Sequence, residues 1–132
     1  MQQLEVAVIG TGASAIQFVP AIQPRVKKLS LFQRTPPWIV PRNDRPISEK
    51  AQRLFRSFPL AQFFIRWLIL LVRELFALPF FYPRLMKYGE TQAIRHMKRA
   101  VKDRELRKKL TPSYRMGCKR ILLSDDYYPA VT

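Results

Sequence analysis

The chain has 132 residues, enough for one compact domain and too few for two full-sized domains side by side. Hydrophobic residues make up 48% and aromatic residues 12%, which argues against wholesale disorder. The formal net charge is +15, from 24 Lys and Arg against 9 Asp and Glu, and a field of this sign attracts phosphates, nucleic acids or anionic membranes.

The chain opens with "VAVIGTGASAIQ", which predicts a buried strand that turns through two glycines into a helix. The strand is expected over Glu5–Ile9 and the helix over Ala13–Ile22, where Pro24 stops it. The next segment, "KLSLFQ" at 28–33, alternates apolar and other side chains and predicts a second strand. The fold class expected is therefore α/β, with a Rossmann-like dinucleotide-binding βαβ start.

The middle of the chain is expected to be helical after an ordered, extended loop. Arg34–Pro46 has four prolines in thirteen residues and is predicted to form neither a helix nor a central strand. Ser48 is a plausible cap for a short helix that runs to Phe58. Leu60–Leu78 predicts a very apolar helix.

The apolar helix invites a membrane interpretation. Its uninterrupted apolar core, Trp67–Val72, is six residues long, whereas a span requires about 20 predominantly apolar residues. Gln62, Arg66 and Arg73 share one narrow face. A helix packed on protein is favoured over a helix at a membrane interface, because an interfacial anchor usually has a broader charged face.

The last part of the chain predicts one more helix and one more strand. Glu90–Leu110 has apolar residues on one side and Lys and Arg around the remainder. "CKRILLS", Cys118–Ser124, predicts a strand that returns to the sheet, and a loop follows. We expect residues 1–47 to begin an NADP-binding domain, 48–111 to be a helical insertion and 112–132 to return to that domain.

Basic residues are concentrated between Arg84 and Arg120, with thirteen Lys and Arg against three Asp and Glu. One explanation of this basic cluster is a solvated helix, and another is that acidic residues in a further part of the protein balance it. Both are favoured over nucleic-acid binding, since no nucleic-acid-binding module accompanies the charge. Cys118 is the only cysteine and His96 the only histidine, so neither a disulfide within the chain nor a metal site is expected. A reducing, cytoplasmic setting is the default.

The glycine turn "GTGASA" is typical of a phosphate-binding loop. Gly10 permits the tight turn, Gly12 lets backbone amides approach a pyrophosphate, and Ala15 replaces the third glycine of the motif. Thr11, Ala13 and Ser14 would lie at the helix N-terminus, where N–H groups and the helix dipole attract phosphate. Glycine turns also occur without a ligand, so this motif alone does not establish that the chain binds a nucleotide.

The end of the second strand indicates which nucleotide would bind. An NAD site usually has an acidic residue there, but this chain has Gln33, Arg34 and Thr35. A guanidinium matches a 2′-phosphate with paired hydrogen bonds, so NADPH is predicted over NADH. The alternative is an ordinary surface arginine.

Three motifs together carry a family resemblance. "VIGTGASAIQ", "FQRTPPWIVPR" and "YRMGCKRILLSDDYYP" occur in this order and spacing in the flavin-dependent Baeyer–Villiger monooxygenases. From Glu5 to Pro129 the sequence resembles the NADPH-binding domain of such an enzyme, with the helical insertion resembling the segment that covers the substrate pocket.

The resemblance implies roles for individual residues. Arg34, Thr35 and Lys119 would face the 2′-phosphate of NADPH. Arg120 matches a catalytic arginine that lies beside the flavin and stabilises negative charge there, as a fixed cation in a dry site does. The pyrophosphate would face the glycine loop, which comprises Gly10, Thr11, Gly12, Ala13, Ser14 and Ala15.

The sequence also departs from the family. A second Gly-rich loop for FAD and the fingerprint Phe-x-Gly-x-x-x-His-x-x-x-Trp-Pro are not found, and His96 has no such neighbours. We expect a fragment that supplies the NADPH site of a parent enzyme, which uses FAD and oxygen on a ketone or a heteroatom, and that is inactive alone. The alternatives are a non-catalytic NADP-binding module, or a basic amphipathic protein on membrane or nucleic acid, with peripheral membrane contact not favoured.

Overall fold

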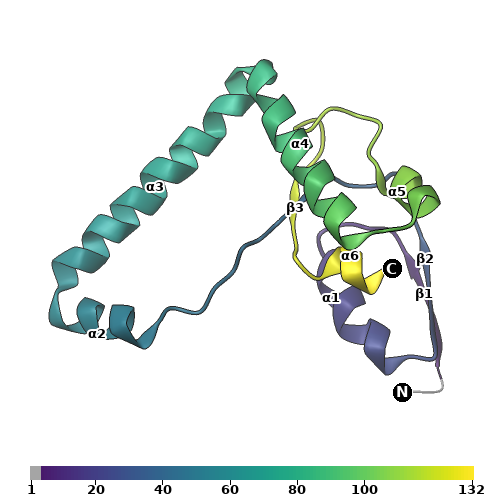
Figure 1. The fold of residues 1–132 in the computed structure, drawn as a ribbon, viewed down its shortest axis with the longest axis horizontal. Coiled ribbons are helices and arrows are strands. Elements are labelled where there is room, and N and C mark those ends of the chain that lie inside the picture. The colour runs from purple at the N-terminus through teal and green to yellow at the C-terminus, as the bar shows by residue number, and fades with distance from the viewer. Residues whose placement is uncertain (1–3) are drawn as a thin grey trace. The chain divides into compact units, whose positions relative to one another are not determined.

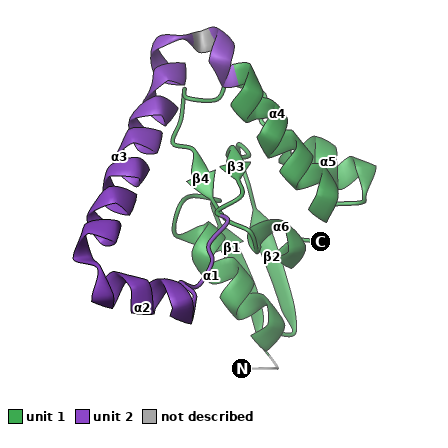
Figure 2. Cartoon of the chain, turned by 60° about the vertical axis from the view of Figure 1, so that its left-hand side comes forward, with its two compact units in different colours: residues 1–42, 87–132 green, residues 43–86 purple. Residues whose placement is uncertain are grey.

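The computed structural model describes residues 4–132, apart from the side chain of Pro83. The chain forms two compact units (Figure 2). One unit joins the residues up to Arg42 with Lys87–Thr132, and the other unit is Asn43–Met86.

The helices and strands follow one another along the chain as labelled in Figure 1. They are β1 (Glu5–Ile9), α1 (Ala15–Ile22), the 3₁₀ turn η1 (Gln23–Arg25), β2 (Lys28–Phe32), β3 (Ile39–Val40), α2 (Glu49–Ser57), α3 (Pro59–Phe81), α4 (Pro83–Ala100), α5 (Arg104–Leu110), β4 (Leu122–Leu123) and α6 (Tyr127–Ala130).

The two N-terminal strands pair in parallel, with α1 between them in the chain. Val6 lies opposite Leu29, and Ile9 opposite Phe32. The predicted bounds of β1 are confirmed, and β2 ends one residue earlier than expected. The helix begins at Ala15, two residues later than predicted, and Pro24 lies in η1 just after its end. The described chain is thus an α/β fragment.

The proline-rich loop contains a strand that the sequence did not predict. Ile39 and Val40 form β3, which pairs in parallel with β4, so that Ile39 lies opposite Leu122. The predicted strand over Cys118–Ser124 shrinks to Leu122–Leu123, and it joins β3 in a second two-stranded sheet instead of pairing with β1 or β2. The hydrogen bonds reach beyond the strands, from Leu122 N to the Trp38 carbonyl and from Ser124 N to the Val40 carbonyl.

The helix predicted over 90–110 is two helices, and the prediction of one continuous helix was wrong. The Asp103 carboxylate caps α5 by accepting hydrogen bonds from the amides of Glu105 and Leu106. Arg107 then donates to the carbonyls of Val101 (2.6 Å) and Lys98 (3.3 Å) at the C-terminal end of α4. These side chains satisfy the backbone groups that a break leaves unpaired. The first helix also begins earlier than expected, at Pro83.

The core of the first unit draws on elements that are far apart in the sequence. Its largest fully buried side chains are Val19 of α1, Ile39 of β3, Met97 of α4, Val101 and Tyr127 of α6. Part of the region predicted as a helical insertion therefore packs with the N-terminal strands and α1.

The second unit is helical and leaves its apolar surface uncovered. Ser48 caps α2 as predicted, because its hydroxyl accepts from the Ala51 amide. No residue of α3 is buried, although the sequence predicted a helix packed on protein. The packing partner expected for α3 is therefore not found among the described residues. None of the helices among residues 4–132 combines the length and apolar character needed to cross a membrane.

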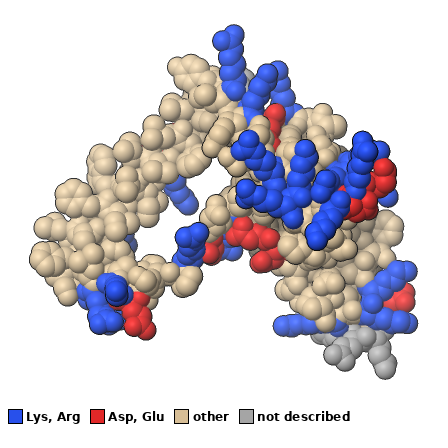
Figure 3. All heavy atoms as spheres, viewed as in Figure 1, with Lys and Arg blue, Asp and Glu red and all other residues tan. Residues whose placement is uncertain are grey.

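Lys and Arg side chains gather over α4 and α5 on the face shown in Figure 3. Few acidic side chains among the described residues lie near these cations. Lys108 forms an ion pair with Glu105 at 2.8 Å, and both side chains are mostly exposed. This exposed pair contributes little to stability, so the basic face remains largely uncompensated locally.

Candidate functional site

A pocket of about 680 Å³ opens beside the glycine turn, and we call it the glycine-loop pocket. All of its lining residues belong to the first compact unit. They are Ile9, Gly10, Thr11, Gly12, Ala13, Phe32, Arg34, Thr35, Pro37, Tyr114, Lys119, Arg120 and Leu122.

The turn after β1 depends on Gly10. Its φ is +97°, a backbone conformation that residues with a Cβ rarely adopt. The Gly10 amide donates to the Phe32 carbonyl at 2.8 Å, which ties the turn to the end of β2. This bond brings the loop and the residues that follow β2 to the same edge of the sheet.

Gly12 keeps space open at the start of α1. A Cβ added at Gly12 would have no neighbour within 4 Å. Packing inside the chain therefore does not explain why this position is a glycine. In the first turn of α1 the amides of Ile16 and Gln17 already donate to the carbonyls of Gly12 and Ser14, at 3.2 and 3.0 Å. The attraction for an anion at this turn therefore comes from the positive end of the helix dipole. Ser14, at the N-cap position, makes no side-chain capping hydrogen bond. The open space at Gly12 lies at this end of α1, where the dipole favours an anionic ligand.

Basic side chains also line the glycine-loop pocket. Arg34 and Thr35 follow β2 directly, and Lys119 comes from the segment before β4. The Lys119 Nζ atom lies over the Tyr114 ring, 4.7 Å from its centroid. Arg34 and Lys119 are exposed, so both cations are accessible to an anionic ligand.

The segment that carries Lys119 and Arg120 is anchored at several points. Trp38 Nε1 donates to the Tyr114 carbonyl at 2.9 Å, and the Met116 amide donates to the Glu90 carboxylate at 3.0 Å. Gly117 has a φ of +95°, which allows the sharp turn before Cys118. These contacts fix the path of the loop from α5 to β4, so the two basic residues follow a defined backbone.

Most of the residues predicted from the sequence line the glycine-loop pocket. Ser14 and Ala15 do not, and Ala15 is buried beneath the turn at 6% exposure. Arg120 lines the pocket and is exposed. The sequence analysis did not single out Tyr114, although it begins the motif "YRMGCKR" and an aromatic residue near a basic pair is a usable signal.

Three tyrosines have raised pKa values. Partial burial raises the pKa of Tyr114 above its ordinary value of 10.0. Burial raises the pKa of Tyr127 to about 12. Burial raises the pKa of Tyr128 further, and the neighbouring Tyr127 adds to this. The last two belong to the core beneath the pocket and not to its surface.

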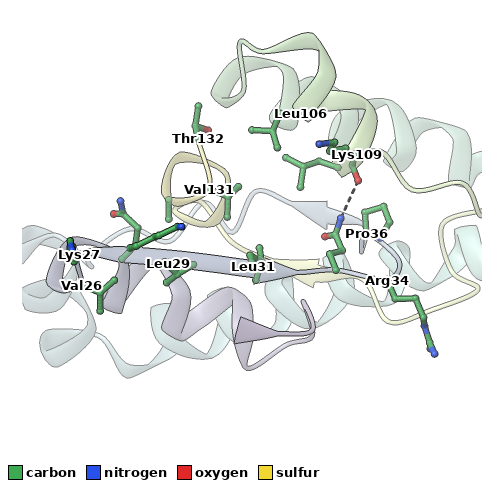
Figure 4. Close-up of a pocket in the computed structure, with 15 residues that line it drawn as sticks. Val26, Lys27, Leu29, Leu31, Arg34, Pro36, Leu106, Lys109, Val131 and Thr132 are labelled. Atoms are coloured by element: carbon green, nitrogen blue, oxygen red, sulfur yellow. Dashed lines mark hydrogen bonds between the residues drawn. The ribbon is translucent and has the colours of Figure 1, made fainter. Parts of the chain in front are cut away.

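A second hollow, of about 650 Å³, lies along β2 on the side of α5 and the C-terminal residues (Figure 4). Leu29, Leu31 and Val131 give it apolar walls, and Gln33 Nε2 donates to the Lys109 carbonyl at 3.1 Å. Arg34 borders both hollows, but in Figure 4 its side chain points away from the other labelled residues. This direction separates its guanidinium from the apolar walls.

Sequence comparison finds relatives in one group of enzymes. The chain is 58% identical over 127 residues to a Baeyer–Villiger monooxygenase of Pseudomonas aeruginosa and 54% identical to one of Streptomyces coelicolor, and each match covers 96% of this chain. An FAD-binding monooxygenase of Botryotinia fuckeliana is 38% identical over 131 residues, which cover 94% of the chain. No family model matches the chain. The chain spans about a quarter of these relatives, 24% in each case.

Solved structures show the same fold. A steroid monooxygenase bound to NADP superposes with a TM-score of 0.75 at 20% identity, over 96% of this chain and 31% of that chain. A cyclohexanone monooxygenase mutant from Rhodococcus sp. Phi1 bound to NADP⁺ superposes with a TM-score of 0.70 at 19% identity, over the same shares of the two chains.

By fold, the chain is an α/β segment that superposes on part of solved monooxygenases bound to NADP. The sequence relatives are named Baeyer–Villiger monooxygenases, which confirms the resemblance drawn from the three motifs. The chain is homologous to about a quarter of the length of these proteins.

Proposed function

We propose that this chain supplies the NADPH site of a flavin-dependent monooxygenase that inserts oxygen beside a ketone carbonyl or oxidises a heteroatom. The observation that carries the proposal is the glycine-loop pocket, which joins the amides after β1 to Arg34, Thr35 and Lys119. Residues 1–47 and 112–132 then form the Rossmann-like NADP-binding part, and 48–111 form the helical insertion.

Each side of the pocket fits one part of the nucleotide. The open space at Gly12, at the positive end of the α1 dipole, would hold the pyrophosphate. Arg34 would pair with the 2′-phosphate through two hydrogen bonds, with Lys119 as a second cation. Thr35 would add a hydroxyl donor beside them.

NADPH would supply a hydride when bound. FAD belongs to the longer protein, because the single Gly-x-Gly loop of this chain is assigned to NADPH and a dinucleotide of that size needs its own loop. Relatives that are named FAD-binding monooxygenases support this assignment. The role that we assign to Arg120 is to stabilise negative charge at the edge of the pocket.

Binding of the two nicotinamide cofactors tests the proposal. We expect the chain to bind NADPH more tightly than NADH, measured by isothermal titration calorimetry. A charge-assisted contact contributes about 1.5 to 3 kcal/mol, so Arg34→Ala should remove on the order of a tenfold to hundredfold preference. Arg45→Ala is a control outside the pocket. Equal dissociation constants for both cofactors in the unaltered chain would overturn the assignment of the 2′-phosphate site.

A spectroscopic measurement separates this proposal from autonomous flavin chemistry. The purified chain should be colourless and should not oxidise NADPH in the presence of a ketone and oxygen, because side chains cannot replace a flavin. A yellow preparation would contradict the proposal. Loss of nucleotide affinity together with salt-sensitive lipid or DNA binding would favour a basic amphipathic protein instead.

A further inference from the structure

The Lys119 ammonium is held over the face of an aromatic ring at the edge of the glycine-loop pocket. Its Nζ atom is 4.7 Å from the centroid of Tyr114, and both residues line the pocket with Arg34. A lysine has four flexible carbons, so an unrestrained ammonium on an exposed loop samples many positions. The ring attracts the cation through its negative face and favours positions beside the pocket.

The ring itself has a fixed position. Trp38 Nε1 donates to the Tyr114 carbonyl at 2.9 Å, and the two rings pack edge to face with centroids 6.5 Å apart. Trp38 is buried at 6% exposure, and it precedes β3 directly. The position of Tyr114 is therefore set by the core, and the position of Lys119 is set by Tyr114.

We propose that Tyr114 is a positioning residue that gives the site part of its preference for a 2′-phosphorylated nucleotide, by holding Lys119 beside Arg34. This inference rests on the proposed NADPH site. The ammonium keeps N–H donors on the side away from the ring, so it can bind a phosphate without leaving Tyr114.

A purely structural role for Tyr114 predicts a different result. Loss of packing would disturb the whole pocket, including the turn at Gly10 and Gly12, and would weaken every nucleotide alike. A positioning role affects only ligands that reach Lys119. The pair 2′,5′-ADP and 5′-AMP separates the two cases, because they differ only in the 2′-phosphate.

Calorimetric titration of the 132-residue chain with these two probes tests the inference. Tyr114→Leu should weaken binding of 2′,5′-ADP about twofold to fivefold and leave binding of 5′-AMP unchanged. Tyr114→Phe keeps the ring and should bind both probes like the unaltered chain. In a Lys119→Ala background, Tyr114→Leu should have no further effect, because the cation that it positions is gone. Tyr88→Leu, at an exposed tyrosine outside the pocket, is the matched control.

An NMR measurement without nucleotide tests the geometry separately. The methylene protons of Lys119 should show a ring-current shift in the unaltered chain and in Tyr114→Phe, and lose it in Tyr114→Leu. Equal weakening of both probes, or an effect of Tyr114→Leu that persists without Lys119, would overturn the inference and leave the proposed site intact. An unaltered chain that binds 2′,5′-ADP no more tightly than 5′-AMP would overturn the proposed function and this inference with it.

Discussion

The Glu90 carboxylate in α4 accepts a hydrogen bond of 3.0 Å from the backbone amide of Met116, twenty-six residues further along the chain. This bond ties a helix of the predicted insertion to the loop that carries Lys119 and Arg120. Gly89 lies next to it, and a Cβ there would meet the Met116 sulfur at 2.8 Å. The close approach of α4 to this loop therefore depends on both positions.

Removal of the Glu90 carboxylate should destabilise the first compact unit. Glu90→Ala leaves a partly buried amide unpaired, at a cost of about 1–3 kcal/mol in the free energy of unfolding. Glu90→Gln keeps an acceptor oxygen and should cost less. Urea unfolding followed by circular dichroism measures both. The control is Glu49→Ala, which breaks an exposed pair with Arg53 and should change stability by less than about 0.5 kcal/mol. Equal effects of Glu90→Ala and Glu49→Ala would contradict this prediction.

The two glycines of the turn should respond differently to alanine. Gly10→Ala forces a Cβ into a left-handed conformation and should destabilise the chain by about 1–2 kcal/mol. Gly12→Ala meets no neighbour and should leave stability within about 0.5 kcal/mol, but its methyl group occupies the space beside the amides and should weaken NADPH binding. Thermal unfolding and calorimetric titration of both variants test this. Unchanged NADPH affinity in Gly12→Ala would show that the pyrophosphate lies elsewhere.

Tyr127 should make the fold sensitive to alkali. Its hydroxyl is buried and has no hydrogen-bond partner among the described residues, and its pKa is raised from 10.0 to about 12. Between these two pH values the unfolded chain loses a proton that the folded chain retains, so stability falls as pH rises through this window. Tyr127→Phe should weaken this dependence and, at neutral pH, preserve or raise stability, because it removes an unsatisfied hydroxyl.

Urea unfolding at pH 8 and at pH 11 measures both effects of Tyr127→Phe. Tyr82→Phe serves as the control, because Tyr82 is 62% exposed. A pH dependence identical to that of the unaltered chain would show that another group causes the alkaline loss of stability.

The uncovered helix α3 should cause the isolated chain to associate. Phe64 and Phe76 are 71% and 72% exposed, within a helix that has no buried residue. An apolar surface of this extent favours contact with other apolar surfaces. Replacing both by Ser should lower the sedimentation coefficient at high concentration and reduce binding of a hydrophobic dye. Arg66→Gln, in the same helix, should do neither. Unchanged association in the double variant would assign it to another surface.

Arg120 should matter for oxygen transfer more than for reduction by NADPH. In a longer version of the protein that carries the flavin-binding region, Arg120→Ala should still permit reduction by NADPH in the absence of oxygen, but product formation should fall by at least a hundredfold, since a fixed cation no longer faces the developing charge. Stopped-flow absorbance and product analysis separate the two steps. Lys119→Ala should show the reverse pattern, with a raised KM for NADPH. Normal product formation in Arg120→Ala would show that this arginine is misplaced.

The sequence by itself determined the local features and the family resemblance. β1 over Glu5–Ile9 and the cap at Ser48 follow from short-range physics, because alternation, turn chemistry and capping involve neighbours in the chain. The three motifs that carry the family resemblance are local as well, and the sequence relatives confirm that resemblance.

Only the tertiary structure decided which distant segments meet. The pairing of β3 with β4 brings Ile39 opposite Leu122, and a proline-rich segment gives no local signal for such a strand. The break between α4 and α5 depends on Arg107 reaching back to the Val101 carbonyl, although basic residues continue through it and hide the boundary. The placement of Lys119 over Tyr114 likewise depends on a core that forms from segments far apart in the sequence, and the cost of closing such loops is repaid only when all of them pack together.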